Sequence, residues 1–270
     1  MDDQLGAYTE EEFRAKFQDI VGSLLKDKAS HTCDEPSAVL LGGQSGAGKT
    51  TLHKIYAERF DNNVIVVSGD EYRSKHPRYR ELDKKYGPES VRYTAPWSGR
   101  MTEALVDALS GMGYNLIVEG TLRTAEVSMK TPRLLRERGY AVSLALMAVK
   151  PEISLLSCQI RYEQMRIAGT VPRATDPARH NKIVHDIAGN LDVLEESGLF
   201  DEVALYTRSE EQLCPRAGGD RRASEVLRDV LFGAWTSEER SHRVFLEGYL
   251  AQLRAKESVL ELRRKERLFR

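Results

Sequence analysis

The chain has 270 residues, of which 41% are hydrophobic and 30% are charged. Its 40 basic and 41 acidic residues give a net charge of -1, which excludes a global basic field for nucleic acid or anionic lipid but leaves a local basic patch open. The three cysteines are far apart, so they form neither a disulfide framework nor a zinc ligand set. A polar, acidic N-terminus and short apolar runs indicate no secretory signal and no membrane span, so we expect a soluble cytoplasmic protein.

Strand and helix patterns alternate along the chain. Thr9, with Glu12 three residues later, forms a capping box that begins a first helix running to about residue 25. Short apolar segments predict strands at 38–41, 64–67, 116–118, 142–149 and 203–206. Longer segments with helical spacing predict helices at 50–59, 98–112, 124–138, 152–165 and 177–197. This alternation is typical of an α/β fold with a doubly wound, mainly parallel sheet that carries helices on both faces.

Two segments depart from this alternation. Residues 71–97 are basic and rich in tyrosine, and we predict a long loop there that serves as a lid or a structural insertion. Base stacking by its aromatic rings is less favoured, because the chain has no RNA-binding motif. We expect residues 1–235 to form the main domain and residues 236–270 a charged helical extension. The extension has a narrow apolar stripe, so it either packs back on the core or projects; the stripe comprises Leu246, Leu250, Leu253 and Leu260.

The strongest motif is the run from Gly43 to Thr50, which matches the phosphate-binding loop pattern at every fixed position. An apolar strand precedes it and a helical pattern follows, so backbone N–H groups and the helix dipole are expected to face a phosphate. We expect Lys49 to reach the β- and γ-phosphates and the Thr50 hydroxyl to bind Mg²⁺. The predicted nucleotide-binding residues are Gly43, Gln44, Ser45, Gly46, Ala47, Gly48, Lys49, Thr50 and Thr51.

Polar side chains follow two of the predicted strands. Asp70 is placed at the end of the second strand, where it is expected to accept a proton from a substrate hydroxyl or to hold Mg²⁺. Glu119 ends the third strand, and Thr121 and Arg123 follow it at the same edge of the sheet. Ligands of doubly wound sheets bind beyond the carboxyl ends of the strands, so these residues predict a substrate wall.

Two arginines are candidates for a cation clamp on a transferred phosphoryl group. Arg161 lies in a predicted helix, and Arg173 lies in a loop that contains glycine and proline. Phosphoryl transfer spreads negative charge over the moving group, and a helix with an adjacent loop is a plausible way to deliver cations to it. The pattern by itself is equally compatible with two solvated arginines.

Six ordered blocks of residues resemble the zeta toxin family, and its PezT branch in particular. The blocks are residues 40–51, Gly69-Asp70 with Arg73, His76 and Pro77, Tyr114-Asn115 leading into residues 119–124, residues 144–146 before 150–152, residues 160–163, and residues 173–175. The resemblance covers residues 8–235. It is weak at residues 167–172, before Arg173, and from residue 237 onward.

Members of that family are the toxin halves of toxin–antitoxin pairs. They phosphorylate the 3'-hydroxyl of the amino sugar of UDP-N-acetylglucosamine, which blocks cell-wall synthesis. The resemblance implies that ATP (or GTP) and Mg²⁺ bind at Lys49 and Thr50, that Asp70 is the base at the acceptor hydroxyl, and that Arg161 and Arg173 clamp the phosphoryl group. It implies substrate contacts from Asp70, Glu103, Glu119, Thr121, Arg123 and Thr131. It also implies a separate antitoxin chain that covers the nucleotide site, because no antitoxin-like helix-turn-helix precedes the kinase.

Two other functions stay open at this point. One is a P-loop kinase for another small-molecule hydroxyl or a polynucleotide end, although the acidic Glu103 and Glu119 argue against a nucleic acid acceptor. The other is a nucleotide-dependent switch whose output is the binding of a partner. Turnover distinguishes the two classes, because a kinase leaves phosphate on an acceptor whereas a switch releases free phosphate.

Overall fold

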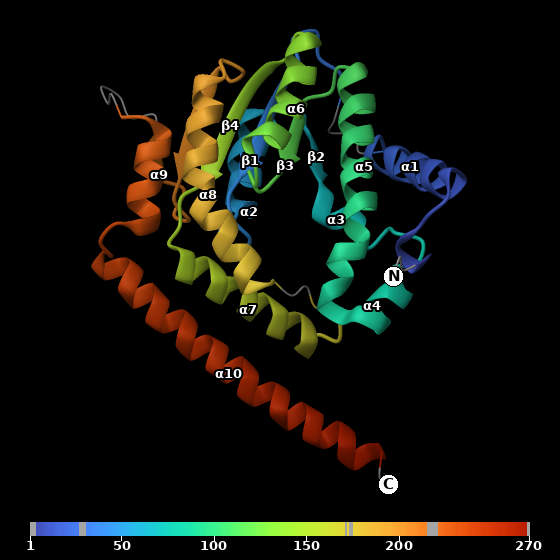
Figure 1. Ribbon diagram of the computed structural model, residues 1–270, viewed down its shortest axis with the longest axis vertical. Coiled ribbons are helices and arrows are strands. Elements are labelled where there is room, and N and C mark those ends of the chain that lie inside the picture. The colour runs from blue at the N-terminus through green and yellow to red at the C-terminus, as the bar shows by residue number, and fades with distance from the viewer. Residues whose placement is uncertain (1–3, 27–30, 171, 173–174, 215–220, 269–270) are drawn as a thin grey trace.

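The computed structural model describes residues 4–26, 31–170, 172, 175–214 and 221–268. These residues form one six-stranded sheet in the order β2-β3-β1-β4-β5-β6 (Figure 1). The strands from β2 to β5 run parallel to their neighbours, and β6 runs antiparallel to β5. The expected mainly parallel α/β fold is therefore confirmed. The strands are β1 (Ser37–Gly42), β2 (Ile65–Ser68), β3 (Leu116–Glu119), β4 (Ala141–Met147), β5 (Glu202–Tyr206) and β6 (Gln212–Cys214).

Helices cover both faces of this sheet, because alternate residues of its strands belong to two different hydrophobic clusters. On β1, Leu40 packs with α1, α5, α6, α8 and α9, whereas Leu41 packs with α2, α7 and α10. The helices are α1 (Glu10–Leu24), α2 (Thr50–Arg59), α3 (Gly69–Arg73), α4 (Tyr79–Tyr86), α5 (Ser90–Gly111), α6 (Ala125–Glu137), α7 (Pro151–Ile167), α8 (Pro177–Glu196), α9 (Ala223–Phe232) and α10 (Ser237–Leu268).

The central strand β1 positions the site. It pairs with β3 on one side and with β4 on the other. The chain segments that follow β3 and β4 therefore leave the sheet on either side of the end of β1. The pairing register sets Leu41 beside Glu119, and Glu119 beside Ser68, at the carboxyl ends of three strands. This divergence creates the crevice in which doubly wound folds bind ligands.

The long loop predicted at residues 71–97 is wrong. The segment is largely helical and comprises the end of α3, all of α4, a 3-10 turn at Gly87–Glu89 and the start of α5. Pro96 lies inside α5, and a proline inside a helix is normally a breaking signal. The segment is ordered by burial of Trp97, whose indole N–H donates to the Tyr72 carbonyl (3.0 Å) and whose ring meets Tyr8 of the N-terminal segment at 4.9 Å between centroids.

Three further elements differ from the sequence prediction. Strand β6 and helix α9 were not predicted. Strand β2 ends at Ser68, and Asp70 lies two residues further on, inside the first turn of α3 rather than at the strand end. Segments as short as β6 and α3 carry too little periodicity to be separated from turns, so the contacts around them decide their conformation.

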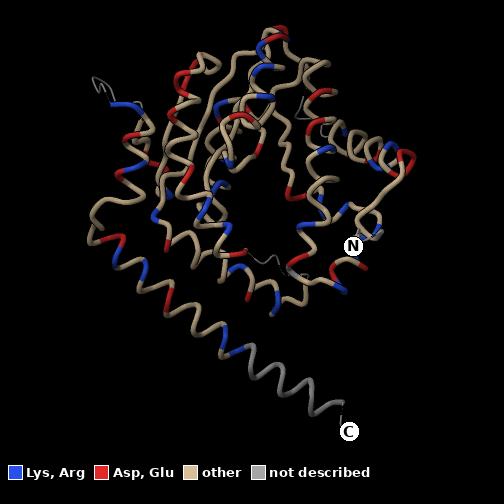
Figure 2. The backbone as a smooth tube through the Cα atoms, viewed as in Figure 1, with Lys and Arg blue, Asp and Glu red and all other residues tan. Residues whose placement is uncertain are grey.

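The described part of the C-terminal extension packs back on the core. Helix α10 carries charges of both signs along its described length (Figure 2). Its Leu246, Leu250 and Leu253 are buried in the cluster that includes α7. Arg254 also pairs with Glu163 of α7, at 3.6 Å. The fourth residue of the predicted stripe, Leu260, lies outside the described side chains. Within the described residues, the structure contains no helix with the length and apolar character that a membrane span requires.

We expect Leu250→Ala to destabilise the protein by about 3 kcal/mol, because it removes a buried side chain and leaves a cavity between α10 and α7. The free energy of unfolding in urea measures this effect. Phe245→Ala on the same helix is the control, since Phe245 is 65% exposed. Equal destabilisation by the two substitutions would show that α10 is not packed as described.

Candidate active site

The phosphate loop follows β1 and leads into α2. Its glycines Gly43, Gly46 and Gly48 have φ angles of 129°, 76° and 97°, a region that residues with a side chain rarely adopt. Gly46 lies against α7, where an added Cβ atom would come 2.1 Å from the Ser154 carbonyl oxygen. The motif therefore needs glycine here both for the backbone angle and for the close approach of α7.

Gly46→Ala is expected to weaken nucleotide binding by about tenfold or more and to destabilise the fold, because the new methyl group forces the loop away from α7. Fluorescence titration with MgADP and thermal unfolding measure the two effects. Gly189→Ala in α8 is the control, since an added Cβ there meets nothing within 4 Å. Unchanged MgADP affinity in the Gly46 variant would contradict this account of the loop.

Lys49 and Glu119 are brought together at the base of the loop. The Lys49 ammonium donates to the Gly43 carbonyl (3.1 Å) and lies 3.7 Å from a Glu119 carboxylate oxygen. The other Glu119 oxygen accepts a hydrogen bond from the Ser68 hydroxyl at 2.6 Å and lies 3.9 Å from His53 Nε2. Lys49 therefore crosses the loop and ends between backbone and carboxylate oxygens, in a position that a phosphate group can share.

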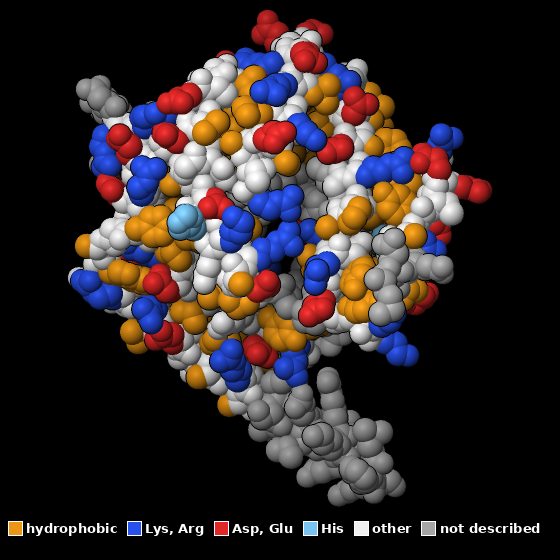
Figure 3. All heavy atoms as spheres, viewed as in Figure 1, with side chains coloured by type: hydrophobic (Ala, Val, Ile, Leu, Met, Phe, Trp, Pro, Cys, Tyr) orange, Lys and Arg blue, Asp and Glu red, His pale blue; other side chains and the backbone are white. Residues whose placement is uncertain are grey.

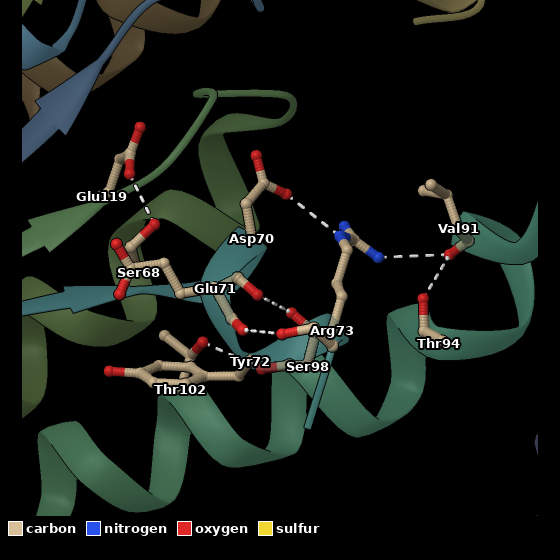
Figure 4. Close-up of polar contacts among 12 residues, drawn as sticks. Ser68, Asp70, Glu71, Tyr72, Arg73, Val91, Thr94, Ser98, Thr102 and Glu119 are labelled. Carbon is tan, nitrogen blue, oxygen red and sulfur yellow. Dashed lines mark hydrogen bonds and ion pairs between the residues drawn. The ribbon is translucent and has the colours of Figure 1, made fainter. Parts of the chain in front are cut away.

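Asp70 projects from α3 toward the same side as Glu119 (Figure 4). Its side chain is 60% exposed, and one carboxylate oxygen accepts a hydrogen bond from Arg73 Nε at 3.0 Å. Arg73 is itself held by the Val91 carbonyl (3.1 Å), and the Ser98 hydroxyl of α5 donates to the Gly69 carbonyl (2.5 Å). Helix α5 thus fixes the short helix that carries Asp70, and the carboxylate remains open to solvent and to a ligand.

The predicted substrate wall is divided between a loop and two helices. Thr121 and exposed Arg123 lie in the loop after β3, whose carbonyls at Leu122 and Arg123 accept hydrogen bonds from Asn190 of α8 (2.8 and 3.1 Å). Glu103 is exposed on α5, and Thr131 lies on α6. These two hydrogen bonds from α8 hold the backbone of the loop that connects Glu119 to α6.

The structure describes one of the two candidate clamp arginines, Arg161. Arg161 lies on α7 with its side chain exposed, one turn after Ser157, as the helical prediction requires. Arg173 lies outside the described residues.

The hollow at the middle of one face of the molecule is bordered by Lys and Arg side chains, so cations gather at its rim despite the nearly neutral net charge (Figure 3).

Sequence reasoning missed Arg208 as a residue of this site. Arg208 follows β5, and its guanidinium donates to the Ala47 carbonyl (3.2 Å), to the Gly46 carbonyl and to the Ser157 hydroxyl (2.9 Å). No local pattern marks it, because it lies about 160 residues after the loop that it contacts. The order of the sheet could have suggested it, because β5 pairs with β4 and β4 pairs with β1.

Sequence reasoning also missed that Gln44 is structural. Its fully buried amide donates to the Val149 carbonyl (2.9 Å) and to the Ser154 hydroxyl (3.3 Å). Ser154 Oγ in turn lies 2.9 Å from Nε2 of His180, and burial lowers the pKa of that imidazole. Gln44 therefore ties the phosphate loop to the segment between β4 and α7 and to α7 itself.

The residues present fit a nucleotide with Mg²⁺. Left-handed glycines, the N-terminus of α2 and Lys49 provide the donors that phosphate oxygens need. The described residues contain no cluster of three or more His, Cys, Asp or Glu side chains that holds a metal by itself. A magnesium ion bound with phosphates needs only one or two protein oxygens, and Thr50 with Glu119 or Asp70 offers them.

Comparisons with known proteins agree with this architecture. Toxin PezT of Streptococcus pneumoniae serotype 4 (strain ATCC BAA-334 / TIGR4) is 43% identical over 234 residues, which cover 86% of this chain and 92% of that protein. Toxin zeta of Streptococcus pyogenes is 38% identical over 202 residues, 74% of this chain and 70% of that protein.

A solved structure from the PezAT chromosomal toxin–antitoxin system of Streptococcus pneumoniae has a TM-score of 0.83 and 39% identity. The match covers 93% of this chain and 99% of that chain. The zeta toxin family model matches residues 22–217, which is more than two thirds of the chain. With the phosphate loop in its expected place, the chain belongs to the zeta toxin family.

Proposed function

We propose that the chain is an ATP-dependent kinase that phosphorylates the 3'-hydroxyl of the amino sugar of UDP-N-acetylglucosamine and acts as the toxin of a toxin–antitoxin pair. The observation that carries the proposal is the placement of Asp70 and Glu119 on one side of the sheet edge, with Glu119 3.7 Å from Lys49 of the phosphate loop. An acceptor hydroxyl held by these carboxylates lies next to a loop built for phosphates. Family membership supports the choice of acceptor.

The phosphate loop holds the donor. Bound ATP with Mg²⁺ supplies the phosphoryl group and neutralises part of its charge. Lys49, which donates to the Gly43 carbonyl here, would bind the β- and γ-phosphate oxygens, and the Thr50 hydroxyl, at the first residue of α2, would hold Mg²⁺. Arg161 and Arg173 stabilise the charge that develops on the moving group, and positioning together with this electrostatic stabilisation provides most of the catalysis.

Asp70 orients the acceptor hydroxyl and takes its proton. The transition state of phosphoryl transfer is loose, so the proton leaves late and alignment of the hydroxyl matters more than the basicity of the carboxylate. Arg73 restrains the Asp70 carboxylate by a 3.0 Å hydrogen bond to one of its oxygens. Glu103, Glu119, Thr121, Arg123 and Thr131 lie on α5, β3, the loop after β3, and α6, and we assign them to the sugar nucleotide.

We further propose that a separate antitoxin protein covers the nucleotide site. The PezAT system to which the structural relative belongs is a toxin–antitoxin system, which supports this assignment. The acceptor is not a nucleic acid in this proposal, because Glu103, Glu119 and Asp70 would face its phosphates with three carboxylates.

Mass spectrometry of UDP-N-acetylglucosamine incubated with the protein, Mg²⁺ and ATP tests the acceptor. The expected result is the gain of one phosphoryl group on the amino sugar. Free phosphate with an unmodified sugar nucleotide would favour a nucleotide-dependent switch. Phosphate transfer to a different hydroxyl compound would keep the kinase and replace the acceptor.

Asp70→Asn is expected to lower this transfer by about 10²-fold or more, because the amide keeps the shape of the carboxylate but accepts no proton. The same variant is expected to be harmless when expressed in bacteria, whereas the wild-type chain stops growth and causes lysis. Glu71→Gln, on the next residue of α3, is the matched control and is expected to stay active and toxic. Equal toxicity of wild type and a folded Asp70→Asn protein would separate the harm from phosphoryl transfer.

A further inference from the structure

Arg208 touches the outside of the phosphate loop rather than its ligand-binding side. Its guanidinium donates to the Ala47 carbonyl at 3.2 Å and to the Gly46 carbonyl. The stem of the side chain lies flat on the loop, since a Cβ atom added to Gly48 would be 3.5 Å from both Cγ and Nε of Arg208. The guanidinium thus makes charge-assisted hydrogen bonds to two consecutive peptide groups of one tight loop.

These bonds determine which way the loop peptides face. In a trans peptide the carbonyl oxygen and the following N–H point in opposite directions. Holding the carbonyls of Gly46 and Ala47 toward Arg208 therefore turns the N–H groups of Ala47 and Gly48 away from it. The Ala47 N–H donates within the loop to the Gln44 carbonyl (3.1 Å), so the Gly48 N–H is the donor that Arg208 directs toward a ligand. Phosphate binding requires this orientation, with N–H groups inward and carbonyls outward.

The residue is fixed before any ligand binds. The turn after β5 is closed by the Thr207 N–H to the Glu211 carbonyl (2.9 Å), and Glu210 adopts a φ of 68° there. Burial lowers the pKa of Arg208 from its usual value, but a guanidinium remains charged in proteins. A permanent cation behind the loop therefore offsets the carbonyl dipoles that face it and adds positive potential at the phosphate side.

The same guanidinium joins the loop to the helix that carries the clamp. Arg208 donates to the Ser157 hydroxyl at 2.9 Å, and this hydroxyl donates to the Ile153 carbonyl at 2.8 Å. Ser157 lies one turn before Arg161 on α7. The phosphate loop and the base of the clamp are thus held at a fixed spacing by one side chain from a third element.

We infer that Arg208 is a positioning residue that holds the phosphate loop in its nucleotide-binding conformation from behind and couples the loop to α7. Without the Arg208 side chain, the loop also populates peptide orientations that do not bind a nucleotide. The apparent affinity for the nucleotide then decreases in proportion to the fraction of molecules that keep the binding conformation. The inference rests on the proposed use of this loop for ATP, but it does not depend on the identity of the acceptor.

Calorimetric titration with MgADP, in the absence of any acceptor, tests the inference on the full chain. Arg208→Ala is expected to weaken MgADP binding by about tenfold or more, and Arg208→Lys to restore only part of it, because one ammonium does not span two carbonyls. Hydrogen exchange of the amides of residues 43–50 is expected to become faster in the alanine variant, a change that loss of a direct nucleotide contact would not produce in the unliganded protein.

Two control variants distinguish an effect on the phosphate loop from a general effect on the surrounding structure. Arg59→Ala removes an arginine that bonds to Glu202 and Tyr206 of β5, the strand that Arg208 follows, and is expected to bind MgADP within about twofold of wild type. Ser157→Ala removes the hydroxyl that accepts the Arg208 bond on α7 and leaves both bonds to the loop carbonyls, so it is also expected to bind MgADP normally. If Arg208→Ala fails to fold, the same comparison is made with Arg208→Lys, for which MgADP binding and loop exchange close to those of wild type overturn the inference.

Wild-type affinity and wild-type loop exchange in Arg208→Ala would overturn the inference, and so would equal losses in Arg59→Ala. Weaker binding with unchanged exchange would make Arg208 a direct nucleotide ligand and would also overturn it. If UDP-N-acetylglucosamine is not the acceptor, the result of this test does not change. The wild type still binds MgADP, and the Arg208→Ala variant still binds it more weakly.

Discussion

Lys49→Ala is expected to reduce phosphoryl transfer by about 10³-fold or more and to weaken MgATP binding. Lys49 is the cation that the phosphate loop places nearest to the Glu119 carboxylate, with its ammonium 3.1 Å from the Gly43 carbonyl and 11% of its side chain exposed. Because the Lys49 side chain is largely buried, loss of its charge removes an attraction that water does not replace. The measurement is the rate of transfer to UDP-N-acetylglucosamine, with nucleotide affinity determined separately.

Lys54→Ala is the matched control for this variant. Lys54 lies on the same helix, α2, and pairs with Glu210 at 3.1 Å while 61% of its side chain is exposed. Exposed pairs of this kind contribute little to stability, so the control is expected to behave as wild type. Near-normal turnover in the Lys49 variant would refute the assignment of the phosphate loop to the nucleotide.

Arg161→Ala is expected to lower kcat by about 10³-fold or more if Arg161 acts as an arginine finger does in other phosphoryl-transfer enzymes. The KM values should change much less, because the charge that Arg161 neutralises develops only in the transition state. Arg161 is exposed on α7, one turn beyond Ser157, whose hydroxyl accepts a hydrogen bond from Arg208. Steady-state kinetics with both substrates varied separates kcat from KM.

Arg166→Ala on the same helix controls for loss of a positive charge. Arg166 pairs with Glu163 at 3.8 Å, on the side of α7 that Arg254 of α10 also reaches. We expect this variant to lose some stability and to keep its kcat. A raised KM with unchanged kcat in the Arg161 variant would make Arg161 a ground-state binder rather than a clamp.

Local patterns were sufficient where one short segment contains all the determinants of its structure. The phosphate loop needs glycines at particular φ angles, a lysine and a hydroxyl within eight residues, so its chemistry and conformation are written in one run from Gly43 to Thr50. The capping box of α1 is similar, since the bond between the Glu12 N–H and the Thr9 hydroxyl joins residues three apart. Strands β1 and β3 were predicted because buried parallel strands are continuous apolar runs.

Contacts between distant segments decided the rest. Residues 71–97 carry prolines, which normally interrupt helices, and they are helical because Trp97 is buried against Tyr8 of the N-terminal segment and bonds to the Tyr72 carbonyl. The sequence placed Asp70 at the sheet edge, but only the structure shows that α5 holds it on a helical turn beside Arg73.

The sequence by itself determined the fold class, the phosphate loop and the family, because each depends on patterns that repeat or on residues that adjoin. The tertiary structure decided that Arg208 supports the loop, that Gln44 is buried in it, and that the described part of α10 covers α7. These relations join residues about 80 to 160 positions apart, and they form only when the strands have taken their order in the sheet and the helices pack on it. The spacing of residues within a segment does not predict the order of the strands, because that order results from how the whole chain buries its apolar faces.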